Sequence, residues 1–277
     1  MRAHRGSRWI VLSAAIPLML TANAQEKATE GNRLAHTPRT VARIDLTGFW
    51  VSVVTQDWAY RMVTPAKGDR GSVPLNSEGS KMADAWDPAK DILENERCNA
   101  YGAPGVMRRP GRLHIYWEND STLRVDLDAG IQTRRFHFAD FLPPTGFETS
   151  EVPISLLRFQ APSGAATRQG YSIAAWQKVA QTRSLQPAQI PDKGGALVVM
   201  TTRMAPGYLQ KNGIPYSADA FLVEYFDRIR LPDGADYLIL TSVIDDSTYL
   251  SEPFVTVTEF KHEGDDSRWT PMPCDPN

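Results

Sequence analysis

The stretch GRLHIYWENDSTLRVDLDAGIQTRRFHF (residues 111–138) decides the fold of this chain. It contains three short segments rich in β-branched and aromatic residues, and these segments are separated by Asn-Asp and Ala-Gly, which are typical of turns. In the first two segments apolar and polar residues alternate, as expected when one face of a strand is buried. The stretch therefore predicts three antiparallel strands in succession.

Further strand patterns lie on both sides of this stretch and bring the total to about nine, without βαβ alternation or internal repeats. Leu231-Pro232-Asp233-Gly234 is a strong turn signal between two of these strands. One helix is expected around residues 77–86, and GYSIAAWQKVAQ (residues 170–181) could contain a helical turn. Many short strands with turn signals indicate a sandwich or a barrel. We predict an all-β fold with minor helix, an antiparallel β-barrel of about 8–10 strands with helical and loop insertions.

The N-terminal 24 residues have the pattern of a cleavable signal peptide. A basic start is followed by a short apolar run and an A-x-A site, which predicts a cut after Ala24. Residues 25–43 are polar and aperiodic and are expected to form a flexible leader, and residues 44–277 a single barrel domain. The expected location is the periplasm or the exterior of the cell.

Two cysteines, Cys98 and Cys274, remain after this cut. In an oxidising compartment two thiols are expected to form one disulfide. No Cys-His or CxxC spacing supports the rival reading of a reactive thiol.

Composition and missing motifs exclude several classes of function. The formal net charge of −2 and the absence of a basic stripe argue against nucleic acid as a partner. The chain has no dinucleotide, phosphate-loop, hydrolase-elbow or zinc-site motif, so we expect neither a cofactor nor a metal. No segment after the signal peptide is apolar for long enough to span a bilayer. The sequence does not indicate the oligomeric state.

Strand phase suggests the first candidate site residues. Aligning the apolar faces of the three strands, and taking Ile131 as an inward residue, places Arg135 and His137 inside the barrel. A cation and an imidazole there would be costly unless they were paired or served a polar ligand. A bulge at Arg134 and Arg135 would instead send Arg135 and His137 to solvent and turn the neighbouring phenylalanines inward.

Two other segments supply aromatic and polar candidates. In TGFWVSVVTQDWAYRMVT (residues 47–64) a second strand is expected to place Trp58 and Tyr60 on one face, next to Arg61. These residues would suit an aromatic lining, although ordinary core packing explains them as well. Tyr225 lies on a strand between 219 and 230 in which neither face is clearly polar.

Gly48-Phe49-Trp50, on the first strand of a chain with an export signal, resembles the G-x-W motif of lipocalins and related calycins. That resemblance implies an up-and-down barrel whose Trp closes one end, often beneath an arginine from late in the chain. Arg228 or Arg268 could serve as this arginine.

Residues 98–260 also resemble a widespread family of exported bacterial proteins without established function. The matching pieces include CNAYGAPGVMRRPGRLHIYWE, GIQTRRFHF and NGIPYSADAFLVEYFDR. This second resemblance implies a β-rich, exported protein and supplies no catalytic residue.

The leading hypothesis is therefore an exported, lipocalin-like protein that holds a small apolar or aromatic molecule inside its barrel. The expected lining residues are Trp58, Tyr60, Arg61, Arg135, His137 and Tyr225. The alternative is a cofactor-free lyase, isomerase or hydrolase on the same barrel. His137 would then be the general acid or base, Arg135 would stabilise an anionic intermediate, and Tyr225 would donate a proton.

Overall fold

The computed structural model describes residues 37–93, 97–138, 162–178 and 195–275. The chain divides into two units, residues 1–37 and residues 38–277, and every helix and strand below belongs to the second unit. The expected signal peptide and most of the expected leader lie outside the described residues.

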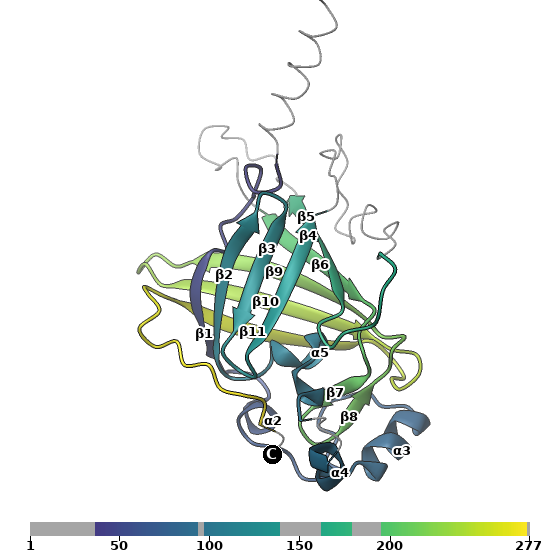
Figure 1. Cartoon of the computed structure of the whole chain (residues 1–277). Coiled ribbons are helices and arrows are strands. Elements are labelled where there is room, and N and C mark those ends of the chain that lie inside the picture. The colour runs from purple at the N-terminus through teal and green to yellow at the C-terminus, as the bar shows by residue number, and fades with distance from the viewer. Residues whose placement is uncertain (1–36, 94–96, 139–161, 179–194, 276–277) are drawn as a thin grey trace, which may run out of the picture. The chain divides into compact units, whose positions relative to one another are not determined.

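The described helices and strands follow one another with short connections (Figure 1). In chain order they are β1 (Gly48–Val53), α2 (Trp58–Met62), α3 (Ser77–Ala85), α4 (Pro88–Leu93), the 3-10 helix η1 (Asn99–Tyr101), α5 (Ala103–Val106), β2 (Arg112–Asn119), β3 (Thr122–Leu127), β4 (Gln132–Phe138), β5 (Tyr171–Lys178), β6 (Gly195–Thr202), β7 (Gly207–Gln210), β8 (Ile214–Tyr216), β9 (Phe221–Arg230), β10 (Asp236–Asp245) and β11 (Phe254–Glu263).

Nine of these strands close into a barrel in the order β1-β2-β3-β4-β5-β6-β9-β10-β11, and β11 pairs back with β1. The expected closed, mostly-β barrel is confirmed. The expected all-antiparallel arrangement is wrong at one position, because β4 and β5 run parallel. A parallel neighbour requires the chain to return to the end where the previous strand began. The remaining strands, β7 and β8, form a separate hairpin.

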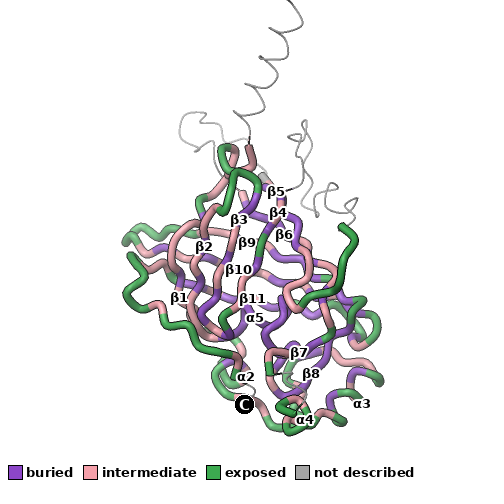
Figure 2. The backbone as a smooth tube through the Cα atoms, viewed as in Figure 1, coloured by how far each residue is buried: buried purple, intermediate pink, exposed green. Residues whose placement is uncertain are grey.

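One face of each barrel strand points inward, and the inward residues continue from strand to strand around the barrel because paired residues share a face. Most of them are apolar and buried, and buried positions alternate with half-buried ones along strands such as β10 in Figure 2. Phe136 on β4 and Phe226 on β9 meet across the interior with ring centroids 5.4 Å apart. The interior is thus largely filled by one apolar cluster, which includes Trp50, Ile115, Val125, Phe136, Trp176, Leu197, Phe226, Leu240 and Phe260.

The register of β4 corrects the inward placement of Arg135 and His137. Leu127 pairs with Gln132 and Leu123 with Phe136, so the even-numbered residues of β4 face the interior. Ile131, taken above as an inward strand residue, belongs to the preceding loop, has a positive φ of 52° and is 62% exposed. Arg135 and His137 therefore face away from the interior, as in the alternative considered above. The regular pairing of β3 with β4 produces this orientation without a bulge.

Trp50 lies inside the barrel with no exposed surface, and its Nε1 donates a hydrogen bond to the carbonyl of Leu46 at 3.0 Å. The guanidinium of Arg228 on β9 lies over its ring, 5.5 Å from the centroid. The expectation of an arginine above this tryptophan is confirmed for Arg228. Arg268 instead forms an ion pair with Glu263 at 3.9 Å.

Helices α2 to α5 and the β7-β8 hairpin gather at the end of the barrel where β4 and β9 begin, which we call the helical end (Figure 1). The expected helix around 77–86 is confirmed as α3, and the side chain of Asn76 caps it by accepting from the backbone N–H of Gly79 at 2.9 Å. The strand expected at residues 58–62 is wrong, because these residues form α2. The helical turn expected within 170–181 is also wrong, since residues 171–178 form β5.

Cys98 and Cys274 form the expected disulfide. The described residues at the start of the second unit differ from the expected flexible leader, because Val41 and Ala42 pack against the core and Trp176 Nε1 donates to the carbonyl of Pro38 at 2.8 Å. Within the described ranges, no helix combines the length and the apolar character needed to cross a bilayer.

Candidate functional site

A cleft of about 800 Å³ lies beside the parallel pair β4-β5. Arg135 and His137, on the outward face of β4, form part of its wall. Residues 166–172, which lead into β5, form another part of the wall, and the remaining lining residues are Asn99, Gln132, Thr133, Ala205 and Pro206. Strand phase in the sequence thus selected two residues that line a cleft, Arg135 and His137. It placed them inside the barrel, whereas they line a cleft on the outer face of β4.

His137 is half-buried in the wall of the cleft. Its ring stacks on that of Tyr171, with centroids 4.9 Å apart and planes 16° from parallel, and its Nδ1 lies 3.4 Å from Thr122 Oγ1. Burial lowers the pKa of His137 below its ordinary value, and the positive charge of Arg135 lowers it further. The imidazole is therefore held mainly in its neutral form at neutral pH, when it can accept a proton or a hydrogen bond.

The described lining of the cleft carries positive but no negative side chains. It includes Arg135 and Arg168, and none of its described residues is an aspartate or a glutamate. Arg135 is held from behind by Glu118, with Nε to Oε2 at 2.9 Å and Nη2 to Oε1 at 3.1 Å. This ion pair fixes the direction of a partly exposed guanidinium, which is the group best suited to bind carboxylate or phosphate.

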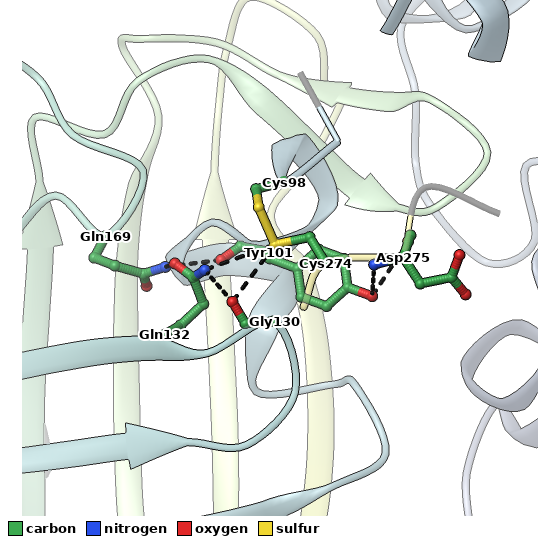
Figure 3. The surroundings of a disulfide bond; sticks show 7 residues. All are labelled: Cys98, Tyr101, Gly130, Gln132, Gln169, Cys274 and Asp275. Atoms are coloured by element: carbon green, nitrogen blue, oxygen red, sulfur yellow. Dashed lines mark hydrogen bonds between the residues drawn. A yellow bond between two sulfur atoms is a disulfide. The ribbon is translucent and has the colours of Figure 1, made fainter. Parts of the chain in front are cut away.

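Two glutamines connect the cleft with the disulfide (Figure 3). Gln169 Nε2 donates to Gln132 Oε1 at 2.9 Å and to the carbonyl of Tyr101 at 2.7 Å. Gln132 Nε2 donates in turn to the carbonyl of Gly130 at 2.6 Å and lies 3.7 Å from Cys274 Sγ. Gln169 Oε1 is buried and has no hydrogen-bond partner among the described residues, so this amide keeps one unsatisfied acceptor beneath the wall of the cleft.

The other predicted site residues do not join this cleft. Trp58 is 66% exposed on α2, and Tyr60 on the same helix has its pKa raised chiefly by the charge of Asp69. Arg61 is buried at the helical end of the barrel. Tyr225 lies on the outward face of β9 in a separate apolar cluster with Ile173 and Val198, and burial raises its pKa. Strands β5 and β6 separate β9 from β4 in the barrel.

The sequence patterns missed Gln132, Gln169, Arg168 and Tyr171. Tyr171 lies in the segment 170–181 that was expected to contain a helical turn, and the pairing of Phe136 with Ser172 that sets it beside His137 is long-range. No local signal could have supplied this parallel pairing.

Comparisons of the chain with protein-family models, with curated proteins and with solved structures found no match. The structure therefore defines the protein by its architecture, a closed nine-stranded β-barrel with a polar cleft on its outer wall.

Proposed function

We propose that the protein is an exported binding protein for a small molecule and that its ligand occupies the cleft beside β4 and β5. The observation that carries this proposal is the cleft of about 800 Å³ with Arg135, Arg168 and His137 in its wall. A volume of this size matches a small-molecule site. We place the site outside the barrel and not in the interior expected from the sequence, because apolar side chains fill much of the interior.

The lining favours a ligand that carries an anionic group and a flat ring. Positive side chains without acidic ones in the described lining attract a carboxylate or a phosphate. The His137 and Tyr171 rings supply aromatic surface at the same wall. This class keeps the aromatic ring of the ligand inferred from the sequence but replaces its apolar character with an anionic group.

Benzoate and its neutral isostere benzamide form a suitable pair of probes. Thermal unfolding of the full chain should show a saturable rise in Tm with benzoate and a much smaller rise with benzamide. His137→Ala and Arg135→Ala should each weaken benzoate binding at least about fivefold, the loss expected from one charged or stacked contact of about 1 kcal/mol.

The outer wall offers matched controls for both substitutions. His114 on β2 is also half-buried and stacks on Phe49 with centroids 4.1 Å apart, but it lies outside the cleft. Arg124 on β3 also forms an ion pair with Glu118, at 3.5 Å. His114→Ala and Arg124→Ala should retain benzoate binding. Equal losses in control and cleft variants would contradict the proposed site.

A second candidate is a cofactor-free enzyme, a lyase, isomerase or hydrolase, that acts in the same cleft. It is favoured by the position of His137 in the wall of the cleft, where burial and Arg135 lower the pKa of the imidazole, so that its neutral form can accept a proton at neutral pH. In this hypothesis Arg135 stabilises an anionic intermediate. Tyr225 does not line this cleft and lies on β9, so it is not kept as the proton donor in this hypothesis. Turnover that survives His137→Ala would remove His137 from the mechanism.

The proposal also includes that the protein is exported and that it is related to lipocalins. The disulfide between Cys98 and Cys274 supports an oxidising compartment, as does the signal-peptide pattern of residues 1–24. The placement of Arg228 over Trp50 supports the likeness to lipocalins. N-terminal sequencing of the exported protein, with Gln25 as the expected first residue, tests the predicted cut.

A further inference from the structure

Three arginines are buried together at the helical end of the barrel. Arg61 comes from α2, and Arg108 and Arg109 lie just after Met107, the C-cap of α5. They are 5%, 5% and 6% exposed, and the charge of Arg108 acts on both Arg61 and Arg109, while that of Arg61 also acts on Arg109. The guanidinium of Arg108 lies 5.3 Å from the ring centroid of Phe254, the first inward residue of β11, which places the group at the mouth of the barrel interior.

The hydrogen bonds of these arginines are incomplete. Arg61 Nε donates to the carbonyl of Arg108 at 3.0 Å, and Arg109 Nη2 donates to the carbonyl of Leu209 at 3.2 Å. Four further nitrogens, Nη1 and Nη2 of Arg61 and Nε and Nη1 of Arg109, are buried without a hydrogen-bond partner among the described residues. The two Nη atoms of Arg61 form a fork of the kind that binds two oxygens of one anion.

Nearby carboxylates balance these charges only in part. Asp57 pairs with Arg108 at 2.9 Å, and Glu259, whose Oε2 accepts from Thr55 Oγ1, acts on Arg61 through its charge alone. Burial lowers the pKa of Arg61 and of Arg109 to about 10, and Arg108 lowers both further, which still leaves each charged at neutral pH. A buried charge without a partner costs several kcal/mol, so the arrangement requires something to accept its hydrogen bonds.

We propose that Arg61 and Arg109 form a binding site for one small oxyanion, a phosphate, sulfate or carboxylate group, with Arg108 contributing to its positive potential. The anion accepts hydrogen bonds from the free nitrogens of both guanidiniums and joins α2 to the segment after α5 at the barrel mouth. This site shares no residue with the cleft beside β4 and β5, so it does not depend on the function proposed there.

The test uses the full chain with its disulfide, purified in chloride buffer. Tm is measured with phosphate, sulfate or acetate at constant ionic strength, and the anions released on unfolding are identified by ion chromatography. We expect either a saturable rise in Tm with at least one of these anions or the release of one oxyanion per chain. Comparison of phosphate with acetate separates the phosphate class from the carboxylate class.

Arg109→Met and Arg61→Met should each abolish the response to the anion and the released oxyanion. In chloride alone their Tm should be equal to or above that of the parent, because each substitution removes an unsatisfied buried charge. Arg112→Met is the matched control, since Arg112 pairs with Glu263 at 2.8 Å and should not affect the anion response. Arg61 and Arg109 lie in different parts of the fold, so the test can still be made with one variant if the other does not fold.

The proposal is overturned if the parent neither releases an oxyanion nor shows a saturable rise in Tm with any of the three. It is also overturned if Arg61→Met and Arg109→Met respond to the anion as Arg112→Met does, since the anion would then bind elsewhere.

Discussion

The guanidinium of Arg134 on β4 donates to both carboxylate oxygens of Glu224 on β9 inside the barrel, at 2.8 Å and 2.6 Å. The side chains of this pair are 0% and 1% exposed. Arg134 also donates to Thr201 Oγ1 at 3.2 Å, and Thr201 shares a hydrogen bond of 2.7 Å with Ser172. The network thus joins β4, β5, β6 and β9, four consecutive strands of the barrel that include the parallel pair.

Breaking this buried pair should be more harmful than replacing it. Arg134→Met leaves the carboxylate of Glu224 buried without its partner, so it should lower the free energy of unfolding by about 3–5 kcal/mol. The double variant Arg134→Met, Glu224→Leu removes both charges and should recover most of that loss. Urea denaturation of the parent, both single variants and the double variant provides the cycle. Additive losses would show that the two side chains are not coupled.

Removal of the disulfide should destabilise the barrel strongly. Cys98 and Cys274 are 176 residues apart in the sequence, and in the chain-entropy model a cross-link over such a loop contributes up to about 5 kcal/mol. Urea denaturation of the Cys98→Ser, Cys274→Ser variant measures the loss. Reductant should destabilise the parent and leave this variant unchanged. An unchanged denaturation midpoint in the variant would contradict the prediction.

Ile131, in the loop between β3 and β4, has a backbone conformation that is unfavourable for its residue type. Its φ of 52° is costly for a β-branched residue, and its side chain is 62% exposed, so little burial compensates. Asparagine tolerates this conformation, and Ile131→Asn should raise the free energy of unfolding by about 1 kcal/mol. Ile229→Asn, at an exposed position within β9, is the control and should give no gain. A destabilised Ile131→Asn protein would argue against strain at this residue.

Acidic pH should destabilise the protein partly through His114 and His137. Burial is the largest cause that lowers the pKa of each, so the unfolded chain binds protons more readily than the folded chain. Their contribution is complete above the unfolded pKa of about 6.5 and is lost as the pH falls from there through the folded pKa. Stability measured at about pH 7.5 and about pH 5 should differ less in His137→Gln and His114→Gln than in the parent. If the loss of stability between about pH 7.5 and about pH 5 were the same in the variants as in the parent, the two histidines would not contribute to it.

The sequence contained enough information for the barrel but not for the position of the site. Alternation along β2 and β3 correctly predicted that their apolar faces align, because a one-residue slip would bury charge, and the structure pairs Leu113 with Leu127 and Ile115 with Val125. On β4 the same reasoning failed. An inward Arg134 is acceptable only because Glu224, 90 residues away, neutralises it, and no local pattern shows that partner.

The helical end shows a second limit of local patterns. Alternation of Trp58, Tyr60 and Met62 suggested a strand, yet the segment forms a helix of five residues in which Arg61 is the buried side chain. Its burial depends on the carbonyl of Arg108, 47 residues later in the chain. The sequence therefore identified Arg61 as a candidate binding residue without indicating which part of the molecule it would face.

The most direct test of the proposed binding site is an NMR titration of the full chain, labelled at histidine, with benzoate. We expect the ring signals of His137 to shift saturably while those of His114, on the same outer face of the barrel, stay in place. Benzoate binding that leaves His137 unmoved, or shifts both rings equally, would contradict the proposed binding site.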